Sequence, residues 1–244
     1  MSDVAIVTGA SSGIGLGIAK TLCRLGYEVF GFGRNFDWSH KESEPSNAKM
    51  EVSEPGTFHK VSCDLLDTAK LEEHIRRIKK EYQIKVLVNN AGTGYYGLHE
   101  ELNPAKIREM ARVNLEVPMV LTNLLLRDLK KSQGTIINIS SVTATSSNPH
   151  GCAYGATKAG LTSFSHSLFD EARKYGVKVV NIQPDMARTN LYRNADFTCS
   201  EEEAAYLLPE DVAEAVAWIL NQRQGVLVTD LTIKPQLHRI RKRK

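Results

Sequence analysis

Tyr154 and Lys158 are four residues apart in a segment whose residue pattern predicts a helix. Residues at positions i and i+4 of a helix share one face, so the two side chains are expected to lie close together. An ammonium group beside a phenol favours the phenolate and should lower its pKa from about 10. A tyrosine with such a pKa can act as general acid or base near neutral pH. By itself the pair is common, and it is more often a packed tyrosine with a surface lysine.

A glycine-rich segment, Thr8-Gly9-Ala10-Ser11-Ser12-Gly13-Ile14-Gly15, follows the first apolar run and opens the first helical pattern. Its glycines permit a tight turn, close approach of backbone to a phosphate, and close packing of the helix. The free N–H groups at the start of the helix and the helix dipole favour a pyrophosphate. Such turns can be purely structural, but this one follows a strand and therefore predicts a dinucleotide site. The expected contacts come from Gly9, Ser11, Ser12, Gly13, Ile14 and Gly15.

The end of the second strand indicates which dinucleotide is bound. Sites that prefer NAD(H) usually have Asp or Glu there to accept a hydrogen bond from the ribose 2′-hydroxyl. Here Gly33 occupies that position and Arg34 follows. A guanidinium can hold a 2′-phosphate that a carboxylate would repel, so the sequence favours NADP(H) over NAD(H). Asp64 and Leu65 follow the third strand, where Asp64 could bind the adenine amine or belong only to the turn before the next helix.

Strand and helix patterns alternate along the whole chain. Strands are expected at 4–8, 28–32, 58–62, 85–89, 135–140, 178–182 and 225–233, and helices at 14–25, 104–131, 151–175 and 201–222. Asp67 is expected to cap a further helix, which places Leu71, Ile75, Ile78 and Tyr82 on one face. This alternation predicts a single-domain α/β fold, a doubly wound parallel sheet (Rossmann fold) with helices on both faces.

The domain is expected to span residues 1–237, and a basic tail, residues 238–244, follows it. We interpret this tail as a solvated, frayed terminus rather than a polyanion-binding arm. Two other segments are irregular. Residues 35–56 are polar, contain Pro45 and Pro55, and are interpreted as a loop. Residues 190–200 should lie over the site and are candidates for a mobile lid.

Composition excludes several classes of function. The 31 basic and 28 acidic side chains give a net charge of +3, too balanced to indicate a nucleic-acid partner. No apolar run approaches the roughly 20 residues of a membrane span, and the first strand begins too early for a signal peptide. The cysteines have no metal-ligand spacing, and each is interpreted as a small buried hydrophobe in a reducing, cytoplasmic compartment; they are Cys23, Cys63, Cys152 and Cys199.

Four motifs in the expected order resemble the short-chain dehydrogenase/reductase family. They are the glycine-rich segment at 8–15, Asn89-Asn90-Ala91-Gly92, Ser141 with Tyr154-Gly155-Ala156-Thr157-Lys158, and the segment from Pro184 to Thr189. The resemblance covers residues 3 to about 233. It implies an enzyme that interconverts an alcohol and a carbonyl by hydride transfer, with Tyr154 passing the proton and Lys158 holding the nicotinamide ribose.

The resemblance also assigns roles to residues far from Tyr154. Ser141, thirteen residues before it, would bind the substrate oxygen, although the adjacent Ser140 competes for this role. Asn114 would break its helix locally and hold a water that links Lys158 to solvent. Thr189 would bind the nicotinamide carboxamide beside Pro184, and the turn made by Asn90, Ala91 and Gly92 would support the adenine-ribose side.

The chain departs from the family pattern near the cofactor and at its end. The usual Pro-Gly after the sixth strand is Pro184-Asp185, which bears on the approach of the backbone to the nicotinamide, and the segment from Val228 to Pro235 lacks an Asp-Gly-Gly motif. In this last segment the chain is more similar to relatives that oxidise 3-hydroxy acids. The segments expected to line the substrate contain five residues that could contact it, and Tyr192 with Arg193 could face either a carboxylate or solvent; the five are Tyr95, Tyr96, His150, Tyr192 and Arg193.

Two further questions are left open by the sequence. Relatives pair the long helices into homodimers or homotetramers, and an apolar face of Leu161, Phe164, Leu168 and Ala172 fits either such an interface or the chain's own core. The alternative to an enzyme is a non-catalytic NADP(H)-binding regulator. The presence of Asn114, Ser141, Tyr154 and Lys158 together favours the enzyme.

Overall fold

A computed structural model describes residues 3–36 and 56–243 of the chain. Seven parallel strands form one sheet in the order β3-β2-β1-β4-β5-β6-β8. The strands are β1 (Val4–Thr8), β2 (Glu28–Gly33), β3 (Phe58–Ser62), β4 (Ile84–Asn89), β5 (Thr135–Ile139), β6 (Lys178–Pro184) and β8 (Asp230–Ile233). The predicted doubly wound parallel fold is confirmed.

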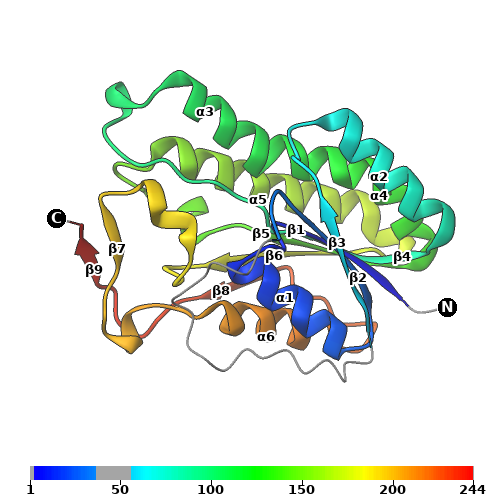
Figure 1. Ribbon diagram of the computed structural model, residues 1–244. Helices are drawn as coiled ribbons and strands as arrows, with labels where there is room; N and C mark the ends of the chain where they lie inside the picture. The colour runs from blue at the N-terminus through cyan, green and yellow to red at the C-terminus, as the bar shows by residue number, and fades with distance from the viewer. Residues whose placement is uncertain (1–2, 37–55, 244) are drawn as a thin grey trace.

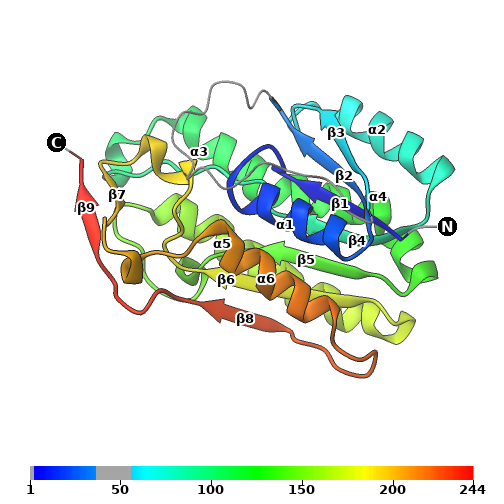
Figure 2. The ribbon, with the colours of Figure 1, turned by 60° about the horizontal axis from the view of Figure 1, so that its bottom comes forward.

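Helices cover both faces of the sheet (Figure 1). On one face lie α2 (Thr68–Glu81), α3 (Pro104–Ala111), α4 (Val117–Ser132) and α5 (Cys152–Ala172), and on the other lie α1 (Gly13–Arg24) and α6 (Pro209–Leu220). Figure 2 shows α1 and α6 side by side on the same face of the sheet. Asp67 caps α2 as expected, because its side chain accepts a hydrogen bond from the Lys70 N–H.

The core has two layers that share the sheet. Successive residues of a strand point to opposite faces, so Val4 and Ile6 of β1 pack in one layer, and Ala5 and Val7 pack in the other. Every residue of β1 is buried. A strand buried on both faces explains why the sequence shows continuous apolar runs rather than alternation.

The last third of the chain follows the expectations in part. The segment at 201–222 contains two helical segments, Glu203–Ala205 and α6, and the strand expected at 225–233 is shorter, since only β8 joins the sheet. The tail is not frayed over its described residues, since β9 (Ile240–Lys242) pairs antiparallel with β7 (Phe197–Cys199). The sequence did not predict this strand, because exposed arginine side chains and a basic composition are not typical of a strand.

Three smaller outcomes concern loops and cysteines. The expected loop at 35–56 lies almost wholly outside the described residues. The segment at 190–200 is more regular than expected, because it contains a 3-10 turn, Asn190–Asn194, and β7. Cys23, Cys63 and Cys199 are buried as predicted, whereas Cys152 is exposed at the start of α5.

Candidate active site

A cleft of about 270 Å³ opens where β1 and β4 lie side by side, at the carboxyl ends of the strands. The order of strands reverses between these two, and such a switch point is where doubly wound sheets bind ligands. All the predicted site residues except Asn114 line this cleft. They are Gly9, Ser11, Ser12, Gly13, Ile14, Gly15, Arg34, Asp64, Leu65, Asn90, Ala91, Gly92, Ser141, Tyr154, Lys158, Pro184 and Thr189.

The glycine-rich turn has the conformation that the sequence predicts. Gly9 and Gly13 have φ of +68° and +54°, a region that favours glycine. A Cβ at Gly15 would lie 2.3 Å from the carbonyl oxygen of Gly9 and 2.4 Å from Nδ2 of Asn90. The first turn of α1 therefore packs directly against the turn that precedes it. Its N–H groups, which have no partner within the helix, open on the cleft.

Thr8 joins this turn to the end of β4. Its hydroxyl oxygen accepts hydrogen bonds from the backbone N–H groups of Asn90 and Ala91, each at 3.0 Å. The side-chain amide of Asn90 donates in return to the carbonyl oxygen of Thr8 at 2.9 Å. The role of Thr8 was not predicted from the sequence. Its position at the last residue of a strand next to the switch point is the signal that could have found it.

The end of β2 leaves little room for a side chain. A Cβ at Gly33 would lie 2.9 Å from Cβ of Ser11. Arg34 follows, exposed at the rim of the cleft. Across the cleft, Asp64 accepts a hydrogen bond from the Leu66 N–H at 3.0 Å, so its carboxylate belongs to the turn before α2 while also lining the cleft. The two interpretations of Asp64 are therefore compatible.

Tyr154 and Lys158 lie on one face of α5, as their spacing predicts. Both are buried, and Lys158 donates a hydrogen bond to the carbonyl oxygen of Ile139 at 2.8 Å. The Lys158 ammonium lies 5.8 Å from the centre of the Tyr154 ring. The Ser141 hydroxyl hydrogen-bonds the Tyr154 side chain and also accepts from the Thr143 N–H at 3.2 Å.

The predicted lowering of the Tyr154 pKa is wrong. Burial raises the pKa of Tyr154 to about 12, and the hydrogen bond from Ser141 lowers it only in part. Burial lowers the pKa of Lys158 to about 8. Desolvation disfavours the charged form of each group, and it outweighs the attraction that the spacing suggested. The phenol is consequently protonated at neutral pH, the form that donates a proton.

The two neighbouring serines point to different places. Ser140 donates to the carbonyl oxygen of Lys158 at 3.0 Å, and its oxygen lies 2.9 Å from the Thr162 hydroxyl. It therefore holds α5 against the sheet. Ser141 is the serine that meets Tyr154, which agrees with the choice made from the family spacing.

Asn114 lies in a π-helical turn, Arg112–Glu116, between α3 and α4, so the expected local break of the helix is confirmed. Its side-chain oxygen accepts from the Thr93 N–H, and its amide donates to the Thr93 carbonyl, each at 2.9 Å. The same amide donates to the Thr157 hydroxyl at 3.1 Å. A Cβ at Gly92 would lie 3.5 Å from Oδ1 of Asn114 and 3.6 Å from Nζ of Lys158. Asn114 thus stands behind the cleft, one layer from Lys158.

Thr189 closes the cleft from the opposite side. A Cβ at Gly13 would lie 3.2 Å from its Cγ2 atom. Its hydroxyl oxygen caps the turn Asn190–Asn194 by accepting from the Leu191 N–H at 3.3 Å. Pro184, the last residue of β6, lines the cleft beside it. The segment after β6 therefore reaches across to the glycine-rich turn.

An aromatic group lies beside Tyr154. The Tyr96 ring is 5.7 Å from the Tyr154 ring and 6.0 Å from the Tyr192 ring, centre to centre. Phe197 of β7 is 5.2 Å from Tyr96 and 5.5 Å from Tyr192. Burial is the main cause that raises the pKa of Tyr96 and of Tyr192 above the ordinary value. The reactive phenol thus belongs to a group of aromatic rings, of which Tyr154 and Tyr192 line the cleft.

Of the remaining substrate candidates, Arg193 lines the cleft, whereas Tyr95 and His150 do not. Arg193 donates one hydrogen bond to the Asn190 carbonyl oxygen at 3.1 Å. The Tyr95 hydroxyl instead pairs with Glu109 at 3.0 Å. The His150 carbonyl oxygen accepts from the Gly97 N–H at 2.7 Å, which joins the two segments expected to flank the substrate.

Two lining residues of α3 and the following turn, Glu109 and Val113, were not predicted from the sequence. They stand one helical turn apart, and Val113 directly precedes Asn114. The i, i+4 spacing was the signal that could have found them.

The apolar face of α5 packs within the chain. Leu168 and Ala172 belong to the core, and Phe164 packs against it. Within the described residues, no helix is long and apolar enough to cross a membrane, and no group of His, Cys, Asp or Glu side chains has the arrangement of a metal site.

The comparisons with known proteins agree with this geometry. A family model described as short chain dehydrogenase matches residues 3–198. The chain therefore belongs to the short-chain dehydrogenase/reductase family and is an NAD(P)-dependent oxidoreductase.

Three similar proteins illustrate the range of the match. An uncharacterized oxidoreductase of Staphylococcus epidermidis is 32% identical over 234 residues, which cover 95% of this chain and 96% of that protein. A probable NADP-dependent dehydrogenase of Haemophilus influenzae is 29% identical, with 96% and 94% covered. The structure of an alcohol dehydrogenase from the archaeon Thermococcus sibiricus, complexed with 5-hydroxy-NADP, has a TM-score of 0.82 at 27% identity and covers 96% of this chain and 97% of that one.

Proposed function

We propose that this chain uses NADP(H) to interconvert an alcohol and its carbonyl compound, a secondary alcohol in the case of a ketone, with Tyr154 as general acid and base. The observation that carries the proposal is the Ser141–Tyr154–Lys158 arrangement, buried together at the carboxyl end of β5. Buried hydrogen-bonding groups at that place can bind a carbonyl oxygen and supply its proton.

The residues at the two ends of the cleft fit the two phosphate-bearing parts of NADP(H), the pyrophosphate and the 2′-phosphate. At one end the glycine-rich turn leaves open space that a Cβ at Gly13 would narrow, and the start of α1 faces it. At the other end, Gly33 has no room for the carboxylate that would select NAD(H), and Arg34 supplies a cation for a 2′-phosphate. The relative named as NADP-dependent and the similar structure with an NADP derivative support this choice.

When bound, the nicotinamide supplies or accepts the hydride. In reduction, Tyr154 donates its proton to the substrate oxygen, and the Ser141 hydroxyl hydrogen-bonds the same oxygen. The Lys158 ammonium stabilises the tyrosinate left behind and would hold the ribose hydroxyls. Asn114 positions the Thr93 and Thr157 segments on either side of Lys158 and would serve the proton relay that refills Tyr154. Oxidation reverses each of these steps.

The substrate class proposed from the residues is a 3-hydroxy or 3-oxo acid. Its carboxylate would bind Arg193, a residue that lines the cleft and whose guanidinium keeps N–H groups beyond the one bonded to Asn190. Its carbon chain would lie against Tyr192, which lines the cleft and contacts Tyr96. Rates measured on substrates of this class, compared with rates on matched ketones that lack a carboxylate, separate the contribution of Arg193 from that of the aromatic residues. The paired long helices of relatives would make the active form a homodimer or homotetramer.

The decisive experiment replaces Tyr154 by phenylalanine. NADPH consumption is measured against ketones, 3-oxo acids, sugars and steroids, and repeated with NADH. We expect Tyr154→Phe to lose about 10²–10⁴-fold in turnover, because it loses the acid, while NADPH binding followed by fluorescence is retained. Tyr175→Phe, an exposed tyrosine far from the cleft, is the matched control.

Wild-type turnover in Tyr154→Phe would refute the assignment. Binding of NADPH without turnover on any substrate of the panel would instead favour a regulatory NADP(H)-binding protein.

The cofactor choice is tested at Arg34. We expect Arg34→Ala to raise the Kd for NADPH about 10–100-fold, since it removes charge-assisted hydrogen bonds to the 2′-phosphate, and to leave the Kd for NADH unchanged. Arg24→Ala, which breaks an exposed ion pair with Glu214 at the other end of α1, is the control. Equal effects on both cofactors would show that Arg34 does not recognise the 2′-phosphate.

A further inference from the structure

The last described residues of the chain return to the segment that covers the cleft. After β8, Leu237 donates a backbone hydrogen bond to the Ala204 carbonyl oxygen at 2.8 Å. β9 then pairs with β7, with Phe197 opposite Lys242 and Cys199 opposite Ile240. Figure 2 shows this path, from β8 at the edge of the sheet to β9 beside β7. We call residues 237–243 the strap and residues 189–205 the substrate loop.

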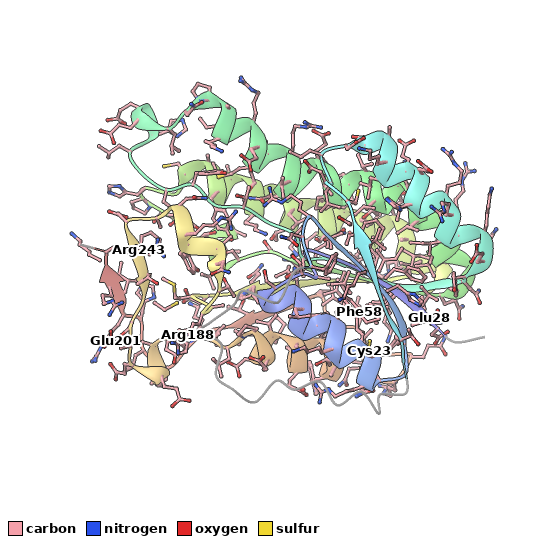
Figure 3. All side chains as sticks on the ribbon, viewed as in Figure 1. Cys23, Glu28, Phe58, Arg188, Glu201 and Arg243 are labelled. Carbon is pink, nitrogen blue, oxygen red and sulfur yellow. The ribbon has the colours of Figure 1, made fainter. Side chains whose placement is uncertain are left out.

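Arginine side chains of the strap attach it to the substrate loop. Arg239 pairs with Glu202 at 2.5 Å, and Arg241 pairs with Glu201. Figure 3 shows Glu201 and Arg243 at the end of the molecule where β9 lies beside β7, far from Cys23 and Glu28. The tail that is basic in sequence is thus matched by acidic residues of the loop.

Arg243 holds the part of the loop nearest the cleft. Its guanidinium donates to the carbonyl oxygens of Arg193 at 3.0 Å and Ala195 at 3.5 Å. Its backbone N–H donates to the Asp196 carbonyl oxygen at 2.6 Å. These bonds fix the end of the turn that carries Tyr192.

A chain of ring contacts connects this attachment to the reactive phenol. Phe197, paired in β7, contacts Tyr96 and Tyr192, and Tyr96 contacts Tyr154. The strap does not line the cleft itself. Any effect it has on the reaction must therefore pass through the position of the substrate loop.

We propose that the strap holds the substrate loop closed beside Tyr154, and that Arg241 and Arg243 are positioning residues for substrate binding. A two-stranded ribbon of three-residue strands is marginally stable alone, so its closed state depends on the arginine contacts. Because the ion pairs are exposed, salt weakens them. This inference rests on the proposed function for the statement that substrate binds beside Tyr154, whereas the closure itself is independent of it.

The test measures amide hydrogen exchange of residues 190–199 in the full chain, with and without NADPH. Arg241→Glu places a negative charge beside Glu201, and Arg243→Ala removes the bonds to the loop carbonyls. We expect each to raise exchange in this segment about tenfold, because local opening becomes easier. The double variant Arg241→Glu/Glu201→Arg should restore protection, and Arg24→Glu, which reverses a charge in the remote exposed pair with Glu214, should leave it unchanged.

A second measurement reports access to the cleft. Acrylamide quenching of bound NADPH fluorescence should increase about threefold in Arg241→Glu and return to the wild-type value in the double variant, since an open loop admits the quencher. Unchanged exchange at 190–199 in both single variants, or no restoration in the double variant, would overturn the strap. Failure of NADPH to bind would refute the proposed function instead, and the exchange measured without NADPH would still decide on the strap.

Discussion

Burial moves the pKa values of Tyr154 and Lys158 in opposite directions. The phenol is raised to about 12 and the ammonium is lowered to about 8, in both cases chiefly by desolvation. At neutral pH the pair consists of a neutral phenol and a charged ammonium. Proton donation to a substrate oxygen leaves a tyrosinate, and a nearby ammonium is the group that makes this charge tolerable.

The pH profile of reduction should follow Lys158. Its pKa in the folded protein lies below the ordinary value, so it is charged below pH 8 and neutral above, while Tyr154 stays protonated to about pH 12. We expect kcat/KM for NADPH-dependent reduction to be level below pH 8 and to fall above it, because the tyrosinate loses its counter-charge. The pH profile of kcat/KM is obtained from initial rates measured from about pH 6 to about pH 10.

Lys158→Arg is the control for this assignment. A guanidinium stays charged throughout that range, so the variant should lack the decline above pH 8 even where its absolute rate is lower. A decline at the same pH in Lys158→Arg would assign the titration to another group.

At the scale of elements, Gly15 lets α1 pack closely against the turn that follows β4. Adding one methyl group there would place it within 2.4 Å of both the Gly9 carbonyl oxygen and the Asn90 amide. The Gly9 backbone and the hydrogen-bonded Asn90 amide cannot both move away to make room for the methyl group. The approach of α1 to the turn, and with it the direction of its first N–H groups, therefore depends on this glycine.

Gly15→Ala should abolish measurable NADPH binding and destabilise the fold by about 2 kcal/mol or more, because overpacking shifts the backbone. Gly17→Ala in the same helix is the matched control, since its Cβ would lie no closer than 3.3 Å to a neighbouring atom. It should remain within about 1 kcal/mol of the wild type, a gain in helix propensity offsetting the tight contact. Urea unfolding and NADPH titration measure both quantities, and equal effects of the two substitutions would contradict this account.

Local sequence patterns predicted those elements whose signals lie within a few neighbouring residues. The strand Val4–Thr8 and the cap at Asp67 are examples, because β-branched runs and capping residues act over a few positions. β9 could not be predicted in this way. Its three residues are exposed, and they form a strand only because β7 and two glutamates more than 35 residues earlier lie beside them.

The same division holds for the site. Tyr154, Lys158 and the glycine-rich turn were predicted because their spacing within one element determines their geometry. The direction of the Tyr154 pKa was predicted wrongly, since burial is a property of the assembled fold that spacing does not contain. Thr8 was missed for a related reason, because its partners Asn90 and Ala91 lie about 80 positions away.

At the scale of the whole molecule, one sheet joins every part of the site. The glycine-rich turn follows β1, Arg34 follows β2, the Asn90 turn follows β4, and Ser141 follows β5. Both core layers pack against the same strands. Loss of either layer exposes the sheet that supports the other, so the described domain should unfold as one unit.

Calorimetry of the full chain should accordingly show a single unfolding transition, and NADPH should shift it upward. A ligand at 100 times its Kd stabilises the native state by about 2.7 kcal/mol, which for a chain of this size corresponds to a rise in Tm of roughly 5–10 °C. In Arg34→Ala the same NADPH concentration should produce about half of this shift or less, because it exceeds the raised Kd by a smaller factor, while the Tm without cofactor should stay unchanged. Two separate transitions would show that the layers are independent, and an equal NADPH shift in Arg34→Ala would remove this arginine from the cofactor site.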